Sequence, residues 1–542
     1  MTTETIQRPS EQAICRQDDC PHKGYIVHTL GATPEGIFGV RWIDDKGQSH
    51  NNCKLEVLES PAAITDEAER PSLLKQTIAK NEKGEWVLVP ARIADFMLSV
   101  ASPLEIQTFK DNKDIVTYDR VADSGVWSLD GAKAIEQVVS GLVEVCGKKL
   151  KEQLTRFVMA EVLAQIQWRT YIGRETFKSP PGKIPLLNGV YDYATGTLEP
   201  HSKDNNFLYQ VPVKYDPTAT CPAIDKFIND VFPKDKIPLA YETTGYMLCA
   251  NANPQPNKHQ RAFMDAGPGD NGKSIWKKVQ TAVLGKANVS HQSLRALVQN
   301  RFAPASLEYK LANIAADIGD KSLINTETFK ILSGGDTIES EHKFKDPHKF
   351  DNTAILSFSC NSVPETYDDS SAYYKRWILT AFDNVFSDTS TPKKDPALID
   401  KLILPEELGG FFNKAIAAYR EMDKRGTFTE EGTTEEKRDG YIKRSNPVLC
   451  FIEEWCLYDP EYAVNKQYLY EEFLTFCRNS GYGKLFSMKR FIMKLREESG
   501  DRIADARIRD GEGKARQCIR GLHLAKDTPV QDGQQKLASG GT

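Results

Sequence analysis

The sequence has no long apolar run, no regular cysteine framework and no net positive charge. No stretch approaches the roughly 18–20 apolar residues of a membrane-spanning helix, and the opening residues MTTETIQRPS have no apolar core for a signal peptide. The 11 cysteines are scattered, which favours reduced thiols, and the loose spacing of Cys15, Cys20 and His22 does not favour a zinc site. We therefore expect a cytoplasmic protein with no membrane partner.

The charge balance is also ordinary. The 70 Lys and Arg against 75 Asp and Glu give a net charge of -5 over 542 residues. This composition is neither that of a disordered acidic chain nor that of a protein that coats nucleic acid. Any nucleic-acid surface must therefore be a local basic patch, and the length favours about three to four domains.

One motif carries chemistry on its own. The segment GPGDNGKS matches the phosphate-binding pattern G-x4-G-K-[ST] in full, between a short apolar run and an apolar-patterned helix that ends before Gly285. Its glycines let backbone N–H groups surround phosphates, and the helix N-terminus adds the positive end of its dipole. The motif predicts a nucleoside triphosphate site built from Gly267, Pro268, Gly269, Asp270, Asn271, Gly272, Lys273 and Ser274.

Within this site each polar side chain has an expected task. Lys273 would hold the β- and γ-phosphates and Ser274 would bind Mg²⁺. Two later apolar runs end in polar residues: Asp317, placed to bind Mg²⁺, and Asn361, placed to orient the attacking water. Taken alone, either residue could instead be turn or helix-cap chemistry. Their order after a phosphate loop favours the functional interpretation.

The ordered motifs GPGDNGKS, IAADIGD, ILSFSCNSVPETYDDS and YYKRWILTAF resemble the superfamily 3 helicases, specifically the phage/plasmid and poxvirus-type primase-helicase group. The resemblance covers roughly residues 90–385. It implies an AAA+ ATPase that forms a hexameric ring and moves 3′→5′ on one DNA strand. It also implies that Lys273 and Ser274 are Walker A and that Asn361 is sensor 1.

The same resemblance makes Asp317 the Walker B acid and Arg376 an arginine finger that acts on the neighbouring subunit. Many members have two adjacent acids at Walker B, whereas Ala316 and Ile318 flank Asp317 here. The general base is then either Asp317 itself or another acid such as Asp320. For Arg376 the alternative is a surface arginine beside a buried Trp377.

Residues 339–350 are expected to form a β-hairpin with Asp346-Pro347 at its tip. In the family this hairpin lines the ring channel and grips the DNA backbone. The residues expected to contact phosphates are Lys343, Lys345, His348 and Lys349, with Phe344 or Phe350 packing or stacking. The alternative is a solvated charged loop.

The C-terminal part predicts three helices and a hairpin, which together make a winged helix. Residues 484–520 hold 11 Lys and Arg against six Asp and Glu, a local basic surplus that is typical of DNA contact. The third helix opens at Ser487 and leaves Lys489, Arg490 and Lys494 mostly outside its apolar face. A winged helix that docks on protein is the alternative.

The predicted fold class is an α/β AAA+ phosphate-loop core with a helical N-terminal region, a small β-rich module and a C-terminal winged helix. The expected segments are a flexible N-terminus 1–23, an SH3-like β-rich module 24–60, a linker 61–89, a mainly helical domain with a β-hairpin 90–205, the ATPase domain 206–422, a linker 423–444, the winged helix 445–525 and a disordered tail 526–542.

The predicted function is that of an ATP- and Mg²⁺-dependent replicative DNA helicase from a mobile element, active in a bacterial, archaeal or virus-infected cell. Its expected partners are single-stranded and forked DNA, further copies of itself in a homo-hexamer, and a replication primase or polymerase. A bifunctional primase-helicase is a second hypothesis, although residues 1–150 offer no obvious acidic catalytic cluster in a large enough domain. A third is an ATP-driven factor that remodels protein without DNA.

Overall fold

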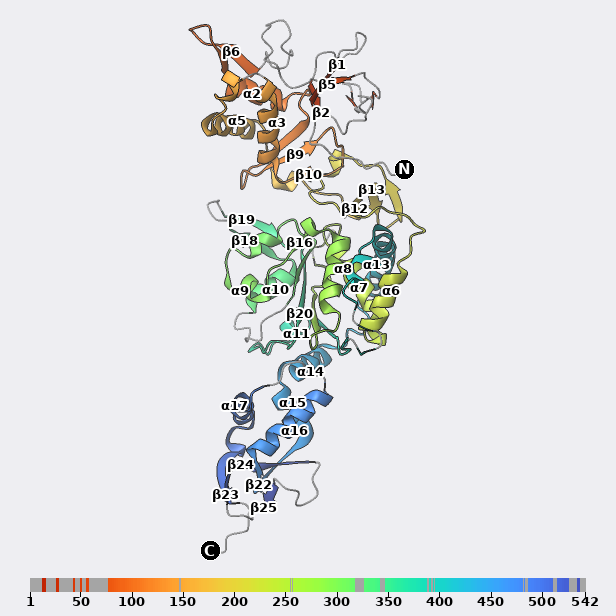
Figure 1. The fold of residues 1–542 in the computed structure, drawn as a ribbon, viewed down its shortest axis with the longest axis vertical. Coiled ribbons are helices and arrows are strands. Elements are labelled where there is room, and N and C mark those ends of the chain that lie inside the picture. The colour runs from red at the N-terminus through yellow and green to blue at the C-terminus, as the bar shows by residue number, and fades with distance from the viewer. Residues whose placement is uncertain are drawn as a thin grey trace. The chain divides into compact units, whose positions relative to one another are not determined.

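The computed structural model divides the chain into two compact units: residues 1–180 with 200–209, and residues 181–199 with 210–542 (Figure 1). It describes residues 12–15, 26–28, 42–43, 49–50, 55–57, 77–145, 148–253, 255, 257–316, 326–341, 347–387, 389–390, 393, 395–480, 482, 486–509, 514–525 and 534–536. Among these residues no helix is both long and apolar enough to cross a membrane.

The first unit begins with short antiparallel strands. They are β1 (Gln12–Cys15), β2 (Ile26–His28), β3 (Trp42–Ile43), β4 (Ser49–His50) and β5 (Leu55–Val57). β1 lies between β2 and β5, and β3 pairs with β4. The expectation of a flexible segment over 1–23 is therefore wrong at β1, which is the central strand of its sheet. Most of the 24–60 module lies outside the described residues.

The rest of this unit is a mixed α/β fold, whereas a mainly helical one was expected. A hairpin of β6 (Ile78–Lys80) and β7 (Trp86–Leu88) leads into α2 (Pro90–Leu98). A sheet follows in the order β10 (Trp127–Ser128), β9 (Ile115–Asp119), β8 (Leu104–Phe109), β11 (Tyr171–Ile172). Leu104 and Ile106 alternate with more exposed neighbours, which is the period-2 pattern of a half-buried strand.

Helices cover one face of this sheet. They are α2, α3 (Gly131–Val145), α4 (Lys148–Lys151) and α5 (Arg156–Arg169), whose apolar side chains share one core with β8 and β9. The other face buries Phe109, Trp127 and Phe177, beside the short helix η1 (Arg174–Thr176). Trp127 Nε1 also donates to the Lys203 carbonyl in η2 (Lys203–Asn205), at 2.9 Å, which holds residues 200–209 in this unit.

The expected β-hairpin is present, but it belongs to the second unit. β12 (Lys183–Leu186), β13 (Gly189–Asp192) and β14 (Thr197–Glu199) are antiparallel, and their two turns hold the Asn188-Gly189 and Thr195-Gly196 dipeptides. The ring of Tyr191 packs on Phe412 of α13 (Pro405–Arg425). The sequence boundary at residue 205 is therefore misplaced.

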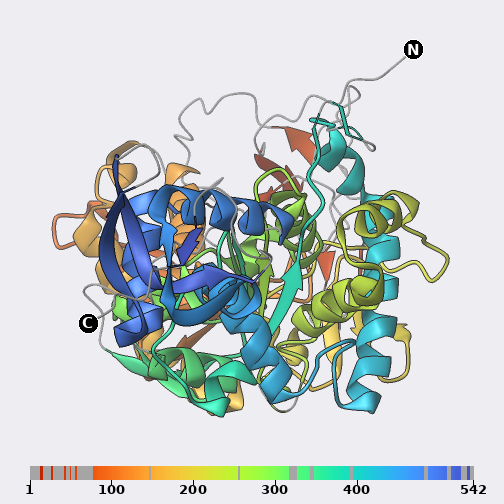
Figure 2. The same cartoon turned by 90° about the horizontal axis from the view of Figure 1, so that it is seen from below.

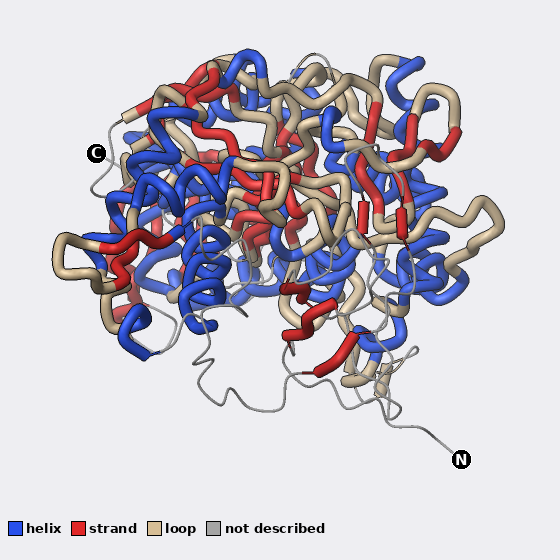
Figure 3. Tube along the Cα trace, turned by 90° about the horizontal axis from the view of Figure 1, so that it is seen from above, coloured by secondary structure: helices blue, strands red, loops and turns tan. Residues whose placement is uncertain are grey.

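The centre of the second unit is a five-stranded parallel sheet, as the α/β alternation of the sequence predicts. Its order is β16 (Val289–Ser290), β17 (Ala312–Ala315), β20 (Ile355–Cys360), β15 (Ala262–Ala266), β21 (Trp377–Ala381). Most residues of these strands are buried and helices lie on both faces, the arrangement that parallel sheets require (Figures 1 and 3).

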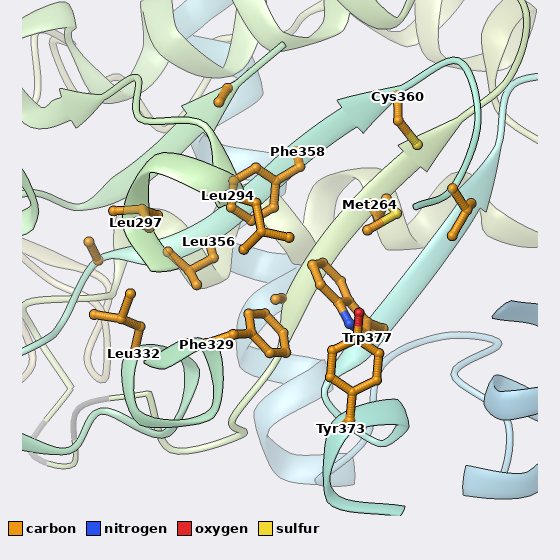
Figure 4. Packing of buried hydrophobic residues seen from close by; sticks show 14 of the residues in the cluster. Met264, Leu294, Leu297, Phe329, Leu332, Leu356, Phe358, Cys360, Tyr373 and Trp377 are labelled. Atoms are coloured by element: carbon orange, nitrogen blue, oxygen red, sulfur yellow. The ribbon is translucent and has the colours of Figure 1, made fainter. Parts of the chain in front are cut away.

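The two faces of the sheet have different helices. α9 (Leu294–Gln299) and α10 (Glu327–Gly334) cover one face, where Met264, Phe358 and Trp377 pack with Phe329 and Leu332 (Figure 4). The other face carries α6 (Pro222–Val231), α7 (Ile237–Leu248), α8 (Lys273–Leu284) and α13. Figure 2 shows the cyan α13 beside the yellow-green α6 and α7. Short helices join these elements: η3 (Lys234–Lys236), η4 (Lys286–Asn288), η5 (Pro304–Leu307), α11 (Ser371–Tyr374) and α12 (Leu398–Leu402).

A buried charge pair ties α8 to the sheet. Lys277 Nζ lies 2.6 Å from Asp265 Oδ2 of β15 and donates to Ser357 Oγ of β20 at 2.7 Å. All three residues are buried. A buried charge is tolerated only when it is paired and hydrogen-bonded, so this contact fixes α8 in one register against both strands.

The segment expected as a solvated linker, 423–444, is folded. α14 (Thr434–Ser445) starts with a capping box in which Thr433 and Glu436 satisfy each other's backbone N–H groups. Tyr441 is fully buried, and its hydroxyl lies 2.8 Å from both the Pro364 carbonyl and the Tyr373 hydroxyl. Most of the segment is charged and only two aromatic residues in it are buried, Phe428 and Tyr441, which is why its composition resembles that of a linker.

The C-terminal part contains the expected three helices and hairpin, together with two further strands. The helices are α15 (Pro447–Trp455), α16 (Lys466–Asn479) and α17 (Met488–Ser499), followed by η6 (Gly500–Arg502). The sheet order is β23 (Ala504–Arg509), β24 (Ala515–Leu524), β22 (Cys456–Asn465), β25 (Gln534–Lys536). β25 pairs with β22, so the expectation of disorder over 526–542 is wrong at these residues.

Candidate functional site

The phosphate-loop motif lies between β15 and α8, at the carboxyl edge of the parallel sheet. Two close approaches show why glycine is needed there. A Cβ on Gly267 would lie 2.2 Å from the Phe382 carbonyl oxygen, and one on Gly272 would lie 2.7 Å from the Val231 side chain. Gly272 also has a φ of +87° and is the residue immediately before α8. A side chain at either position would clash, so only glycine lets the backbone turn this tightly into the N-terminus of α8.

The lysine of the motif is already inside this loop. Lys273 is buried, and its ammonium donates at 2.8 Å to the carbonyls of Gly267 and Pro268 and to Oδ1 of Asn271. The Asn271 amide in turn donates to the Phe382 carbonyl at 2.7 Å. Ser274 is exposed in the first turn of α8. The loop therefore offers the ammonium of Lys273 and the positive end of a helix, which fit a phosphate chain. The exposed hydroxyl of Ser274 fits the metal ion that accompanies the phosphates.

The pairing of the sheet strands brings Asn361 next to the phosphate loop. β20 pairs with β15 in parallel with Ala266 opposite Cys360, and the Gly267 amide donates to the Cys360 carbonyl at 3.2 Å. Asn361, the next residue, is exposed directly beside the loop. β17, which leads to Asp317, is the neighbour of β20 on the other side. Asp317 and Asp320 themselves lie outside the described residues.

Arg376 lies at the opposite end of the sheet. It precedes β21, where Trp377 is opposite Ala262, and the Ala262 amide donates to the Arg376 carbonyl at 2.7 Å. Five strand residues separate this edge from Gly267, roughly 17 Å at the usual rise of a strand. The side chain of Arg376 therefore cannot reach the phosphate loop of its own subunit.

The guanidinium of Arg376 is half-buried. One terminal nitrogen donates to the Ala372 carbonyl at 2.5 Å, and Nε has no acceptor within the described part of the chain. Partial burial lowers the pKa of Arg376 from its ordinary value; the carboxylate of Asp336 opposes that shift and Arg261 adds to it. The Nε donor is itself buried, so it does not face solvent.

The expected DNA-gripping hairpin is formed by β18 (Thr337–Ser340) and β19 (His348–Asp351), with Ser340 opposite His348. Lys349 is exposed on it, while Phe350 is buried in the sheet core and packs rather than stacks. Lys343, Lys345 and Phe344 lie outside the described residues.

His348 does not face solvent. Its imidazole is buried, with Nε2 2.8 Å from Oε2 of the nearly buried Glu308, and its ring packs beside Phe350. The expectation that His348 contacts DNA phosphates is therefore corrected: it holds the loop end of the hairpin against the chain segment after η5. A charged partner 40 residues away explains why the local sequence pattern is misleading.

The three basic residues expected on the DNA-facing side of α17 have different environments. Lys489 is exposed. Arg490 is half-buried, with its guanidinium 4.4 Å from the centre of the Phe486 ring. Lys494 is paired with Glu365 at 2.9 Å and with Glu497 at 3.2 Å, and only 12% of its side chain is exposed. Lys494 is thus a docking contact to the loop after Asn361 and not a DNA contact.

The sequence reasoning missed two cations near the loop. Lys443 and Arg444 lie in the last turn of α14. A guanidinium nitrogen of Arg444 lies 3.8 Å from a carboxylate oxygen of Asp383. The neighbouring Phe382 and Phe386 form hydrogen bonds with the phosphate loop through their backbone groups. They lie in the stretch that was predicted to be a linker. The signal that could have found them is the capping-box pattern at Thr433 and Glu436.

Comparison with known proteins gives two family matches. Residues 106–233 match the family described as "D5 N terminal like", and residues 266–376 match a "Family of unknown function (DUF5906)". The second match begins at the phosphate loop and ends at Arg376. Neither match extends over half of the chain.

Curated relatives are viral. The chain is 22% identical over 356 residues to "Putative helicase 121R" of Invertebrate iridescent virus 3, covering 59% of this chain and 37% of that protein. It is 25% identical over 297 residues to "Putative helicase L207/L206" of Acanthamoeba polyphaga mimivirus, covering 50% and 30%. The chain thus spans about a third of the length of these relatives.

Among solved structures, the A form of the apo NrS-1 C-terminal region covers 80% of this chain and 99% of its own, at 10% identity and a TM-score of 0.42. The D5-like match and the viral relatives confirm the resemblance to the phage and viral primase-helicase family that the motifs indicate.

The His348–Glu308 contact predicts a stability effect. His348→Ala removes the imidazole that bonds to the buried carboxylate of Glu308 and should cost about 2 kcal/mol in local stability. Hydrogen exchange at the amides of 337–340 and 348–351 should accelerate accordingly, while the exposed Lys349→Ala serves as the matched control and leaves it unchanged. Equal protection in the His348 variant would show that this contact does not hold the hairpin.

Proposed function

We propose that this protein is an ATP-dependent DNA helicase of a mobile genetic element, acting in replication as a hexameric ring. The observation that carries the proposal is the parallel pairing of β15 with β20, which places Asn361 beside a complete phosphate loop. The viral relatives named as helicases support the same class of activity. The proposed nucleotide is ATP with Mg²⁺.

In this proposal the loop residues bind the nucleotide. Lys273 exchanges its three loop acceptors for β- and γ-phosphate oxygens, and backbone amides of 267–274 surround the phosphates. The exposed Ser274 hydroxyl and the carboxylate of Asp317 would hold Mg²⁺, which supplies charge neutralisation on the phosphates when bound. Asn361 orients the attacking water from the next strand.

The position of Arg376 supports a ring. A finger that lies roughly 17 Å from its own loop has to act on the loop of a neighbouring copy. Its guanidinium is only partly buried, which suits a contact with phosphate across a subunit boundary. Hydrolysis then requires assembly, and the family resemblance suggests six subunits.

DNA contact is assigned to two elements. The β18–β19 hairpin presents Lys349 and leads into the segment with Lys343 and Lys345, which would bind backbone phosphates in the ring channel. The C-terminal helices with the β23–β24 hairpin form the proposed winged helix, in which Lys489 is an exposed cation of α17. Translocation is proposed to run 3′→5′, with single-stranded or forked DNA as substrate.

The nucleotide assignment predicts that Lys273→Ala abolishes ATP hydrolysis. Removing the only ammonium inside the described phosphate loop should lower the steady-state rate by at least about 100-fold. Lys278→Ala is the matched control, because Lys278 is exposed on the same helix and should retain the wild-type rate. Near-normal turnover in the Lys273 variant would refute the site assignment.

The trans role of Arg376 predicts complementation. Arg376→Ala alone should reduce hydrolysis by about 1,000-fold or more. In mixtures with Lys273→Ala subunits, some interfaces join an intact loop to an intact finger, so activity should reappear and peak near equal amounts. Mixtures that stay inactive at every ratio, although both variants assemble, would argue that Arg376 does not act across the interface.

A further inference from the structure

Most cations of α17 are already engaged by other groups of the chain. Lys494 pairs with Glu365, and the guanidinium of Arg496 pairs with a carboxylate of β23. Arg490 is half-buried, with its guanidinium against an aromatic ring. Among the cations of this helix, only Lys489 has a side chain without a hydrogen-bond or ion-pair partner in the described part of the chain. A helix that reads the major groove usually presents about three or four side chains to the base edges, and α17 has few to offer.

The β23–β24 hairpin carries two more cations of this kind. Arg507 and Arg509 are both exposed, and neither side chain has a partner among the described residues. Because side chains alternate along a strand, these two arginines share one face of the hairpin. Their Cα atoms are roughly 7 Å apart, which lets each guanidinium meet its own phosphate along a DNA strand. Lys514 and Arg516 nearby each interact within the chain.

The positions opposite these two arginines are neutral. Across the antiparallel ladder, Gln517 lies opposite Arg507 and Ala515 lies opposite Arg509. No acid on the paired strand therefore competes for either guanidinium. The same positions hold no aromatic side chain, whereas sites for single-stranded nucleic acid combine cations with rings on which bases stack. This face thus suits the phosphates of duplex DNA better than the bases of a single strand.

Paired charges brace the base of the hairpin. Asp505, the acid of β23, lies 2.7 Å from Nζ of Lys466 on α16 and also pairs with Arg496 of α17. These two cations offset the negative charge that Asp505 would otherwise present beside a bound phosphate. The segment 510–513 between the strands holds two acids and no cation, so the basic positions of the hairpin lie outside it.

We propose that the β23–β24 hairpin, and not α17, makes the main DNA contact of the C-terminal part, with Arg507 and Arg509 bound to backbone phosphates of a duplex. The assignment rests on the proposed function, because it takes the C-terminal part to be a DNA-binding winged helix. Phosphate contacts carry no base-specific information. The winged helix therefore holds duplex DNA without selecting a sequence.

The test measures binding of the full chain to a blunt DNA duplex, without nucleotide, over a series of salt concentrations. The double variant Arg507→Gln with Arg509→Gln should bind about tenfold more weakly. Its slope of log K against log salt should be shallower by about 1.8, because each phosphate contact contributes about 0.9. Each single variant should lose about half of that slope, which keeps the test valid if the double variant fails to fold. Lysine at both positions should preserve most of the slope.

Two matched controls remove a cation elsewhere. Lys489→Ala tests α17 directly and should change duplex affinity by less than about twofold. Lys349→Ala removes an exposed cation of the β18–β19 hairpin, which is proposed to bind a single strand, and should also leave duplex affinity nearly unchanged. Melting temperatures show whether each variant is folded.

The outcomes separate the hairpin contact from the proposed function. A wild-type protein that binds neither duplex nor single-stranded DNA would overturn the proposed function. Binding of single strands but not of duplex by the wild type would overturn only the hairpin contact, as would a folded glutamine variant with unchanged affinity and salt slope. A loss of duplex binding in Lys489→Ala as large as that of the double variant would also overturn it, by assigning the contact to α17.

Discussion

Parallel hydrogen bonding between β15 and β20 is the constraint from which the rest of the site follows. Because Ala266 lies opposite Cys360, the phosphate loop and Asn361 leave the sheet at the same edge. The buried Asp265–Lys277–Ser357 contact fixes α8 against both strands, so the helix N-terminus points at that edge. In parallel α/β sheets, ligands bind at the carboxyl ends of the strands, and this edge has the donors to bind phosphate.

The second organising contact is the attachment of the C-terminal helices to the loop after Asn361. Glu365 pairs with Lys494 of α17, and Tyr441 of α14 bonds to the Pro364 carbonyl. An ion pair and a hydrogen bond thus connect the loop after Asn361 to α17 and α14. Arg376 lies at the far edge of the sheet, where we propose that it contacts the nucleotide of a neighbouring subunit.

The features that could be predicted from the sequence are those encoded within a short stretch of residues. GPGDNGKS, the apolar runs before Asp317 and Asn361, and the hairpin dipeptides all lie within short windows, and the structure has the strands and turns that they predict where it describes them. The misassigned residues depend on distant partners. His348 bonds to Glu308, and Lys494 forms an ion pair with Glu365. No local sequence pattern encodes either contact. The strands β8 and β9 were missed because their alternation is short and lies between strong helical patterns.

Strand displacement, measured with ATP on forks that carry either a 3′ or a 5′ single-stranded tail, tests the central claim most directly. We expect ATP hydrolysis that rises with single-stranded DNA and displacement only from the 3′-tailed fork. Hydrolysis that is robust but indifferent to DNA, with no displacement from either fork, would contradict it and would point instead to a motor that remodels protein.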